Sequence, residues 1–114
     1  MQTLFWLYLI GGILLALLSI PLIAGKVKPN PFYGFRVPAT LENPDLWYPV
    51  NKYFAKRQLF VALADIIASV GFFFWPNISV DAYALSVLGV FVLAFGLALA
   101  QSWKYLKSLP QKAK

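Results

Sequence analysis

The chain opens with an uncharged apolar stretch, LFWLYLIGGILLALLSIPLIA (Leu4–Ala24). Two similar stretches follow, QLFVALADIIASVGFFFW (Gln58–Trp75) and AYALSVLGVFVLAFGLALAQSW (Ala82–Trp103). A helix needs roughly 20 apolar residues to cross the hydrocarbon core of a bilayer. Only 12% of the residues are charged and 61% are hydrophobic, whereas about 25% of a soluble domain is charged. The sequence therefore predicts an all-α integral membrane protein with three transmembrane helices in a single membrane domain, 1–114.

The basic residues indicate how these spans are oriented. All ten Lys and Arg residues lie either in the segment 25–57 or in the tail 104–114. The N-terminal residues 1–3 and the segment 76–81 between the second and third stretches carry none. Short loops rich in Lys and Arg stay in the cytoplasm. We therefore expect a multi-pass protein with its N-terminus outside, its C-terminus in the cytoplasm, and a cytoplasmic loop at 25–57. The net charge of +6 then favours membrane lipids as partners and not nucleic acid.

The loop 25–57 is expected to be structured. Its first half contains three prolines, which favour extended backbone, and Gly34 predicts a tight turn or a close backbone approach. Its second half has the pattern of a helix, with Asn43 as the capping residue and Pro44 at the first helical position. Apolar residues then recur every fourth position, at Leu46, Val50 and Phe54. This pattern predicts an interfacial amphipathic helix that leads into the second span.

Small residues in the first and third spans mark expected helix contacts. Gly11 and Gly12 are adjacent in the first span, and Gly96 and Ala100 have the small-xxx-small spacing in the third. Such residues let two helix backbones approach closely. We expect packing within one protomer, and a homo-oligomer is the alternative.

Asp65 is an ionisable residue inside the predicted second span. Such a residue is costly in a bilayer and by default marks a functional site with a charged or polar partner. The expected partners are Arg36 or Lys26, or a hydrogen-bonding network with Ser69 or Ser19. A small oligomeric proton-coupled transporter is one interpretation. The other is a carboxylate that anchors the loop or faces a wet crevice.

Arg36, flanked by Phe35 and Tyr33, is the second candidate. A guanidinium can hold a phosphate or carboxylate through two hydrogen bonds. One interpretation is therefore a protein that binds or modifies a lipid headgroup with Arg36 and either Glu42 or Asp45. The other is that Arg36 is only a positive charge that sets the topology. The chain has no Cys and no His, which excludes disulfides, thiolate catalysis and the usual zinc and haem sites. The sequence predicts no enzyme activity, no cofactor and no metal.

The loop also carries an ordered set of residues. Lys28-Pro29-Asn30 is followed by Tyr33-Gly34-Phe35-Arg36-Val37-Pro38-Ala39-Thr40, and then by Trp47 and Asn51. This order resembles the signature of the SdpI family of small bacterial membrane proteins. The resemblance implies a plasma-membrane protein that gives immunity to a secreted peptide toxin, or signals its presence by holding a cytoplasmic repressor at the membrane. Such a protein acts by binding.

The resemblance also implies a site in the loop, made of Asn30, Arg36, Thr40, Trp47 and Asn51. In this hypothesis Arg36 is the central donor, and the two asparagines and Thr40 hold the loop against the membrane. Trp47 anchors the helix at the interface. The ligand is a lipid headgroup, a toxin segment or a repressor. The alternative is an internal network that only shapes the loop.

Overall fold

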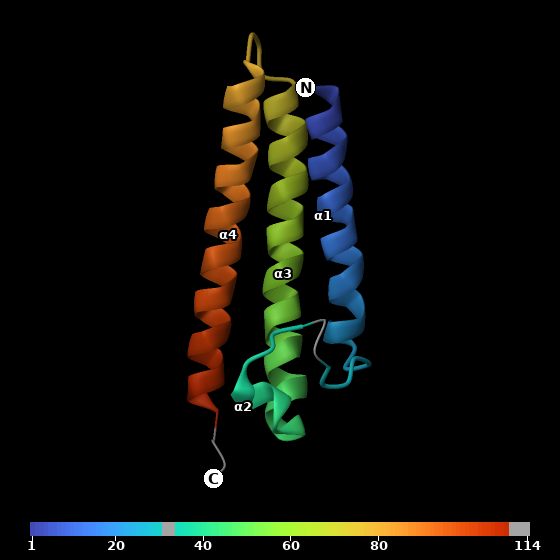
Figure 1. Cartoon of the computed structure of the whole chain (residues 1–114), viewed down its shortest axis with the longest axis vertical. Coiled ribbons are helices and arrows are strands. Elements are labelled where there is room, and N and C mark those ends of the chain that lie inside the picture. The colour runs from blue at the N-terminus through green and yellow to red at the C-terminus, as the bar shows by residue number, and fades with distance from the viewer. Residues whose placement is uncertain (31–33, 110–114) are drawn as a thin grey trace.

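The computed structural model describes residues 1–30 and 34–109, and every regular element within these residues is a helix. In chain order they are α1 (Gln2–Ile23), α2 (Pro38–Leu41), α3 (Pro44–Phe73) and α4 (Val80–Ser108). The three long helices lie side by side and alternate in direction, with α3 between α1 and α4 (Figure 1). The loop that contains α2 and the end of α4 therefore lie at one end of the bundle, and the N-terminus lies at the other.

The predicted interfacial helix and second span form one continuous helix. α3 begins as predicted, with the Asn43 side chain accepting a hydrogen bond from the Asp45 N–H at 3.1 Å and with Pro44 at the helix start. It then continues without interruption for 30 residues. Pro49 lies in its second turn, where a proline removes one backbone hydrogen bond. A separate interfacial helix is not confirmed, because the buried face at Val50 and Phe54 continues along the same helix.

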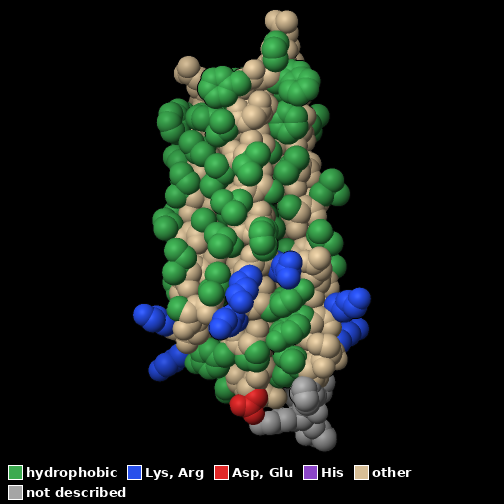
Figure 2. Space-filling view, turned by 180° about the vertical axis from the view of Figure 1, so that it is seen from behind, with side chains coloured by type: hydrophobic (Ala, Val, Ile, Leu, Met, Phe, Trp, Pro, Cys, Tyr) green, Lys and Arg blue, Asp and Glu red, His purple; other side chains and the backbone are tan. Residues whose placement is uncertain are grey.

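The two outer helices have strongly apolar surfaces. Within the described residues, α1 and α4 are each long and apolar enough to cross a bilayer by length and composition. Their exposed side chains include Leu7 at 63% and Leu93 at 76%. Figure 2 shows hydrophobic side chains over most of one face and a band of Lys and Arg toward the end that carries α2. Soluble monomers rarely expose so large an apolar surface.

Aromatic clusters hold the bundle together at both ends. At the end where α1 begins, Tyr83 is fully buried, and its hydroxyl donates to the Ser69 carbonyl at 2.9 Å. The Tyr8 hydroxyl donates to the Ala84 carbonyl at 3.0 Å, which ties α1 to α4. At the other end, the loop, α3 and α4 share a buried cluster of Phe35, Leu46, Val50, Phe54 and Leu106.

The contact between α1 and α3 depends on one glycine. A Cβ atom at Gly12 would lie 2.6 Å from Asp65 Oδ2, whereas a Cβ at Gly11 would meet nothing within 4 Å. The close helix approach is thus confirmed for Gly12 only. The expectation of packing within the protomer is wrong for Gly96 and Ala100, because a Cβ at Gly96 also meets nothing within 4 Å and Ala100 is exposed.

Candidate functional site

Asn51 fixes the loop onto α3. Its side chain is 1% exposed, and its Oδ1 accepts a hydrogen bond from the Phe35 N–H. Its Nδ2 donates to the Trp47 carbonyl at 3.0 Å. Gly34 makes this approach possible because its φ is +112°, and a Cβ there would lie 2.7 Å from Asn51 Oδ1. Of the two alternatives predicted for Gly34, a tight turn or a close backbone approach, the close approach is confirmed.

Thr40 closes the turn that follows Phe35. The Thr40 hydroxyl accepts a hydrogen bond from the Val37 N–H at 3.1 Å and donates to the Phe35 carbonyl at 2.9 Å. The side chain is fully buried. A single hydroxyl group thus satisfies two backbone groups that would otherwise lose hydrogen bonds on burial.

Trp47 joins the loop to α3 from within. Its Nε1–H donates to the Val27 carbonyl at 2.7 Å, and the side chain is 0% exposed. The indole therefore packs inside the protein and does not present its ring outward as an anchor at the membrane interface. The reason is the loop itself, which folds back over the helix and covers this face.

The predicted site residues therefore divide into two groups. Thr40, Trp47 and Asn51 are buried in one hydrogen-bonded network, which agrees with the interpretation that they shape the loop. Arg36 is exposed beside them, on backbone that this network holds in place. Asn30 is half-buried, and its Nδ2 donates to the Lys28 carbonyl at 2.7 Å in a local turn.

The neighbours proposed for Arg36 lie at different places. Phe35 is buried in the cluster with α3 and α4 and stacks on Phe54 with 5.5 Å between ring centroids. Tyr33 lies outside the described residues. Glu42 and Asp45 are both exposed near the junction of α2 and α3.

Asp65 lies far from the cations that were expected to pair with it. It is 14 residues beyond Asn51 on α3, which corresponds to about 21 Å along the helix, so Arg36 does not reach it from the loop. Lys26 follows the C-terminal end of α1, 14 residues beyond Gly12, which is the α1 residue beside Asp65. It is therefore similarly distant from Asp65. Ser69 and Ser19 donate to carbonyls of their own helices, at 2.9 and 2.8 Å. The expected partners of Asp65 were therefore wrong.

Asp65 instead lies at the floor of a groove between α1 and α4. The side chain is 3% exposed, and it contributes to a cavity of about 420 Å³. Apart from Asp65 and Tyr8, the residues that line the cavity are apolar; they include Leu14, Leu18 and Phe91. Within the described residues, Asp65 has no ion pair. A carboxylate without a cation in such surroundings is the arrangement expected of a functional group or a bound-proton site.

Two polar residues at the start of the predicted second span were not recognised from the sequence. Gln58 Nε2 donates to Ser19 Oγ at 3.0 Å and links α3 to α1. In the sequence Arg57 counts only among the basic residues of the segment 25–57, yet its Nε is buried and has no hydrogen-bond partner within the described residues. The available signal is their position at the boundary of an apolar stretch, with Arg57 directly before it and Gln58 as its first residue.

The fold and the loop define a small helical membrane protein in which an ordered loop covers the end of the central helix. The chain belongs to the SdpI/YfhL protein family, whose family model matches residues 26–102, more than half of the 114 residues. The match includes the loop, α3 and most of α4. It thus contains every residue of the hydrogen-bonded network. No match was found among the curated proteins or among the solved structures.

Proposed function

We propose that this chain is a three-span protein of the bacterial plasma membrane that gives immunity to a secreted peptide toxin or signals its presence. It acts by binding and not by catalysis. Family membership fits a toxin-immunity role. The observation that carries the proposal is the buried network of Thr40, Trp47 and Asn51, which holds Arg36 exposed on an ordered loop.

The proposed topology follows from helix length and charge. α1 and α4 are long and apolar enough to span. α3 has 30 residues and is about 45 Å long, whereas the hydrocarbon core is about 30 Å thick. Its apolar part therefore spans while its first turns, with Lys52 and Lys56, project from the membrane beside the loop. The basic end is cytoplasmic under the positive-inside rule, so the N-terminus is outside.

Single-cysteine labelling tests this orientation. The wild-type chain has no cysteine, so no native cysteine has to be replaced first. We expect Pro76→Cys, in the exposed turn between α3 and α4, to react with a membrane-impermeant maleimide in intact cells. Glu42→Cys, in the loop, should react only after permeabilisation. The reverse pattern would show that the orientation is inverted.

Arg36 is the proposed contact for the partner. A guanidinium on a fixed backbone binds a carboxylate or phosphate with less entropy loss than one on a flexible segment. The partner group is an acidic or phosphorylated group of a toxin segment or a repressor at the cytoplasmic surface. Asn30 lies on the same loop and supplies a further amide.

Survival of a toxin-sensitive bacterium challenged with a membrane-active killing peptide tests the proposal. We expect wild-type protein to protect and Arg36→Ala to lose most of that protection at equal expression, because a charge-assisted contact contributes roughly 1.5–3 kcal/mol. Lys52→Ala removes the same charge from an exposed site on α3 and should still protect. If Arg36→Ala protects as well as Lys52→Ala does, Arg36 is not part of the binding site.

A second candidate is a small oligomeric proton-coupled transporter that uses Asp65. The observation that favours it is the buried carboxylate without an ion pair at the floor of the α1–α4 groove. This candidate predicts the opposite mutational pattern, in which Asp65→Asn abolishes function and Arg36→Ala is tolerated. pH-dependent flux into liposomes that contain each variant would distinguish the two; absence of flux in the wild type would exclude transport.

A further inference from the structure

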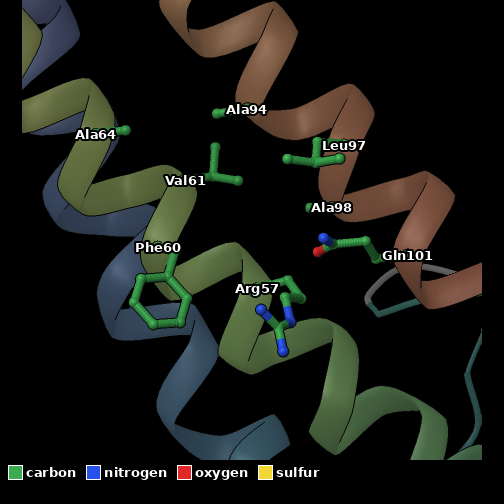
Figure 3. A pocket seen from close by; sticks show the side chains of 8 residues that line it. All are labelled: Arg57, Phe60, Val61, Ala64, Ala94, Leu97, Ala98 and Gln101. Atoms are coloured by element: carbon green, nitrogen blue, oxygen red, sulfur yellow. The ribbon is translucent and has the colours of Figure 1, made fainter. Parts of the chain in front are cut away.

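A second groove lies between α3 and α4 and ends at a basic side chain. It has a volume of about 340 Å³. Small side chains from both helices leave it open, namely Ala64 on α3 and Ala94 and Ala98 on α4 (Figure 3). Arg57 and Gln101 come from these facing helices at the end of the groove nearer to α2. The groove is therefore apolar along its length and polar at one end.

Arg57 is held in place by aromatic rings, and it has no anionic partner in the part of the chain that the structure describes. Its guanidinium carbon lies 4.9 Å from the centroid of the Tyr53 ring and 5.9 Å from that of Phe60. Its Nε is buried and makes no hydrogen bond within the described residues. An arginine that presents Nε–H together with one terminal N–H can hold two oxygens of a phosphate or carboxylate at once. The buried Nε–H is therefore an unsatisfied donor that such a ligand would satisfy once the guanidinium turns toward the groove.

From Arg57 the groove runs along α3 toward Ala64, as an acyl chain below a lipid headgroup would. Ala64 lies seven residues further along α3, about 10 Å from Arg57. It also borders a second apolar hollow of about 590 Å³, lined by Ala68, Gly71 and Trp75 among others. The two hollows meet at Ala64. Along α3 their lining residues run from Arg57 to Gly71, a length of about 21 Å, which exceeds the roughly 15 Å that one leaflet contributes to the hydrocarbon core.

The charge around the groove selects among possible occupants. Lys56 and Lys104 are exposed within one turn of Arg57 and Gln101 on the same helices. A second copy of this chain packed symmetrically here would bring its own basic residues against these. An anionic lipid brings the opposite charge, and attraction of this kind contributes about 1 kcal/mol per basic residue near a membrane surface.

We propose that the α3–α4 groove is a binding site for one anionic phospholipid of the surrounding bilayer. Its phosphate accepts hydrogen bonds from Arg57 and Gln101, and one acyl chain lies along Ala64, Ala94 and Ala98. The site is separate from Arg36 and from Asp65. The lipid would fill the groove along α3 and α4 and thereby join the two helices.

Native mass spectrometry of the detergent-solubilised protein, incubated with either phosphatidylglycerol or phosphatidylcholine, tests this site. We expect one phosphatidylglycerol to remain bound to the wild type and phosphatidylcholine to bind more weakly. Arg57→Gln should weaken phosphatidylglycerol binding roughly tenfold or more, as loss of a charged hydrogen bond does. Lys56→Gln makes the same change in net charge outside the groove and should weaken binding clearly less than Arg57→Gln, because it removes only the attraction of about 1 kcal/mol near the membrane surface.

Ala94→Leu fills the groove while it keeps Arg57, and it should weaken binding to a similar extent. Circular dichroism and elution volume confirm that each variant remains folded. Equal loss in Lys56→Gln and Arg57→Gln would show a general charge effect and overturn the site. The same conclusion follows if Ala94→Leu binds normally, if both lipids bind equally, or if the wild type is a dimer that Ala94→Leu dissociates.

Discussion

Gly34→Ala is expected to detach the loop from α3. A residue with a Cβ at positive φ costs about 1–2 kcal/mol, and Gly34 has φ +112°. The new Cβ would also lie 2.7 Å from Asn51 Oδ1 and 3.2 Å from the Trp47 ring. Both side chains are buried, and overpacking at such a site costs about 1–3 kcal/mol. Together these terms predict a loss of about 3 kcal/mol in the stability of the loop.

Trypsin cleavage at Arg36 in detergent micelles measures this loss, because the ordered loop protects the bond that follows Arg36. We expect cleavage there to be much faster in Gly34→Ala than in the wild type. Gly25→Ala is the matched control. Gly25 also has positive φ, at +71°, but a Cβ there meets nothing within 4 Å. If both variants are cleaved after Arg36 at the same rate, the contact with Asn51 does not hold the loop.

Gly12→Val is expected to separate α1 from α3. The added Cβ alone would lie 2.6 Å from Asp65 Oδ2, 2.7 Å from Ile66 Cγ1 and 3.3 Å from the Ala62 carbonyl oxygen. The two side chains can adjust, but the backbone oxygen cannot, and valine has few alternative rotamers in a helix. The helices must therefore move apart. We expect a loss of about 3 kcal/mol, at the upper end of overpacking costs.

The free energy of unfolding, measured by titration with a denaturing detergent, checks this value. Gly11→Val places the same side chain on the neighbouring residue, where a Cβ meets nothing within 4 Å, and should change stability little. A loss of similar size in both variants would mean that valine destabilises α1 wherever it is placed. The structure predicts instead that only the face at Gly12 is sensitive.

Several local features could be predicted from the sequence because each depends on a few neighbouring residues. The start of α3 at Asn43 and Pro44 follows from capping chemistry. The close approach at Gly34 follows from the freedom of glycine at positive φ and from its missing Cβ. The family signature lies in the loop and led to the same family that the match over residues 26–102 shows.

The partners of individual side chains could not be predicted in the same way. Trp47 was expected at the membrane interface, but the loop covers it and Val27 accepts its hydrogen bond. Asp65 was expected to meet Arg36 or Lys26, but the antiparallel packing places it beside Gly12. Both outcomes depend on how the loop and helices meet in three dimensions. Periodicity along one helix does not contain this information.

The sequence by itself determined the helical class, the apolar stretches and the gathering of basic residues in two segments. Hydrophobicity and charge are properties of the residues themselves, so they can be read in order along the chain. Only the tertiary structure decided that Gly12 and not Gly11 contacts α3, and that Arg57 borders a groove. Successive residues of a helix point about 100° apart, so the rotation of each helix about its axis determines which side chains meet.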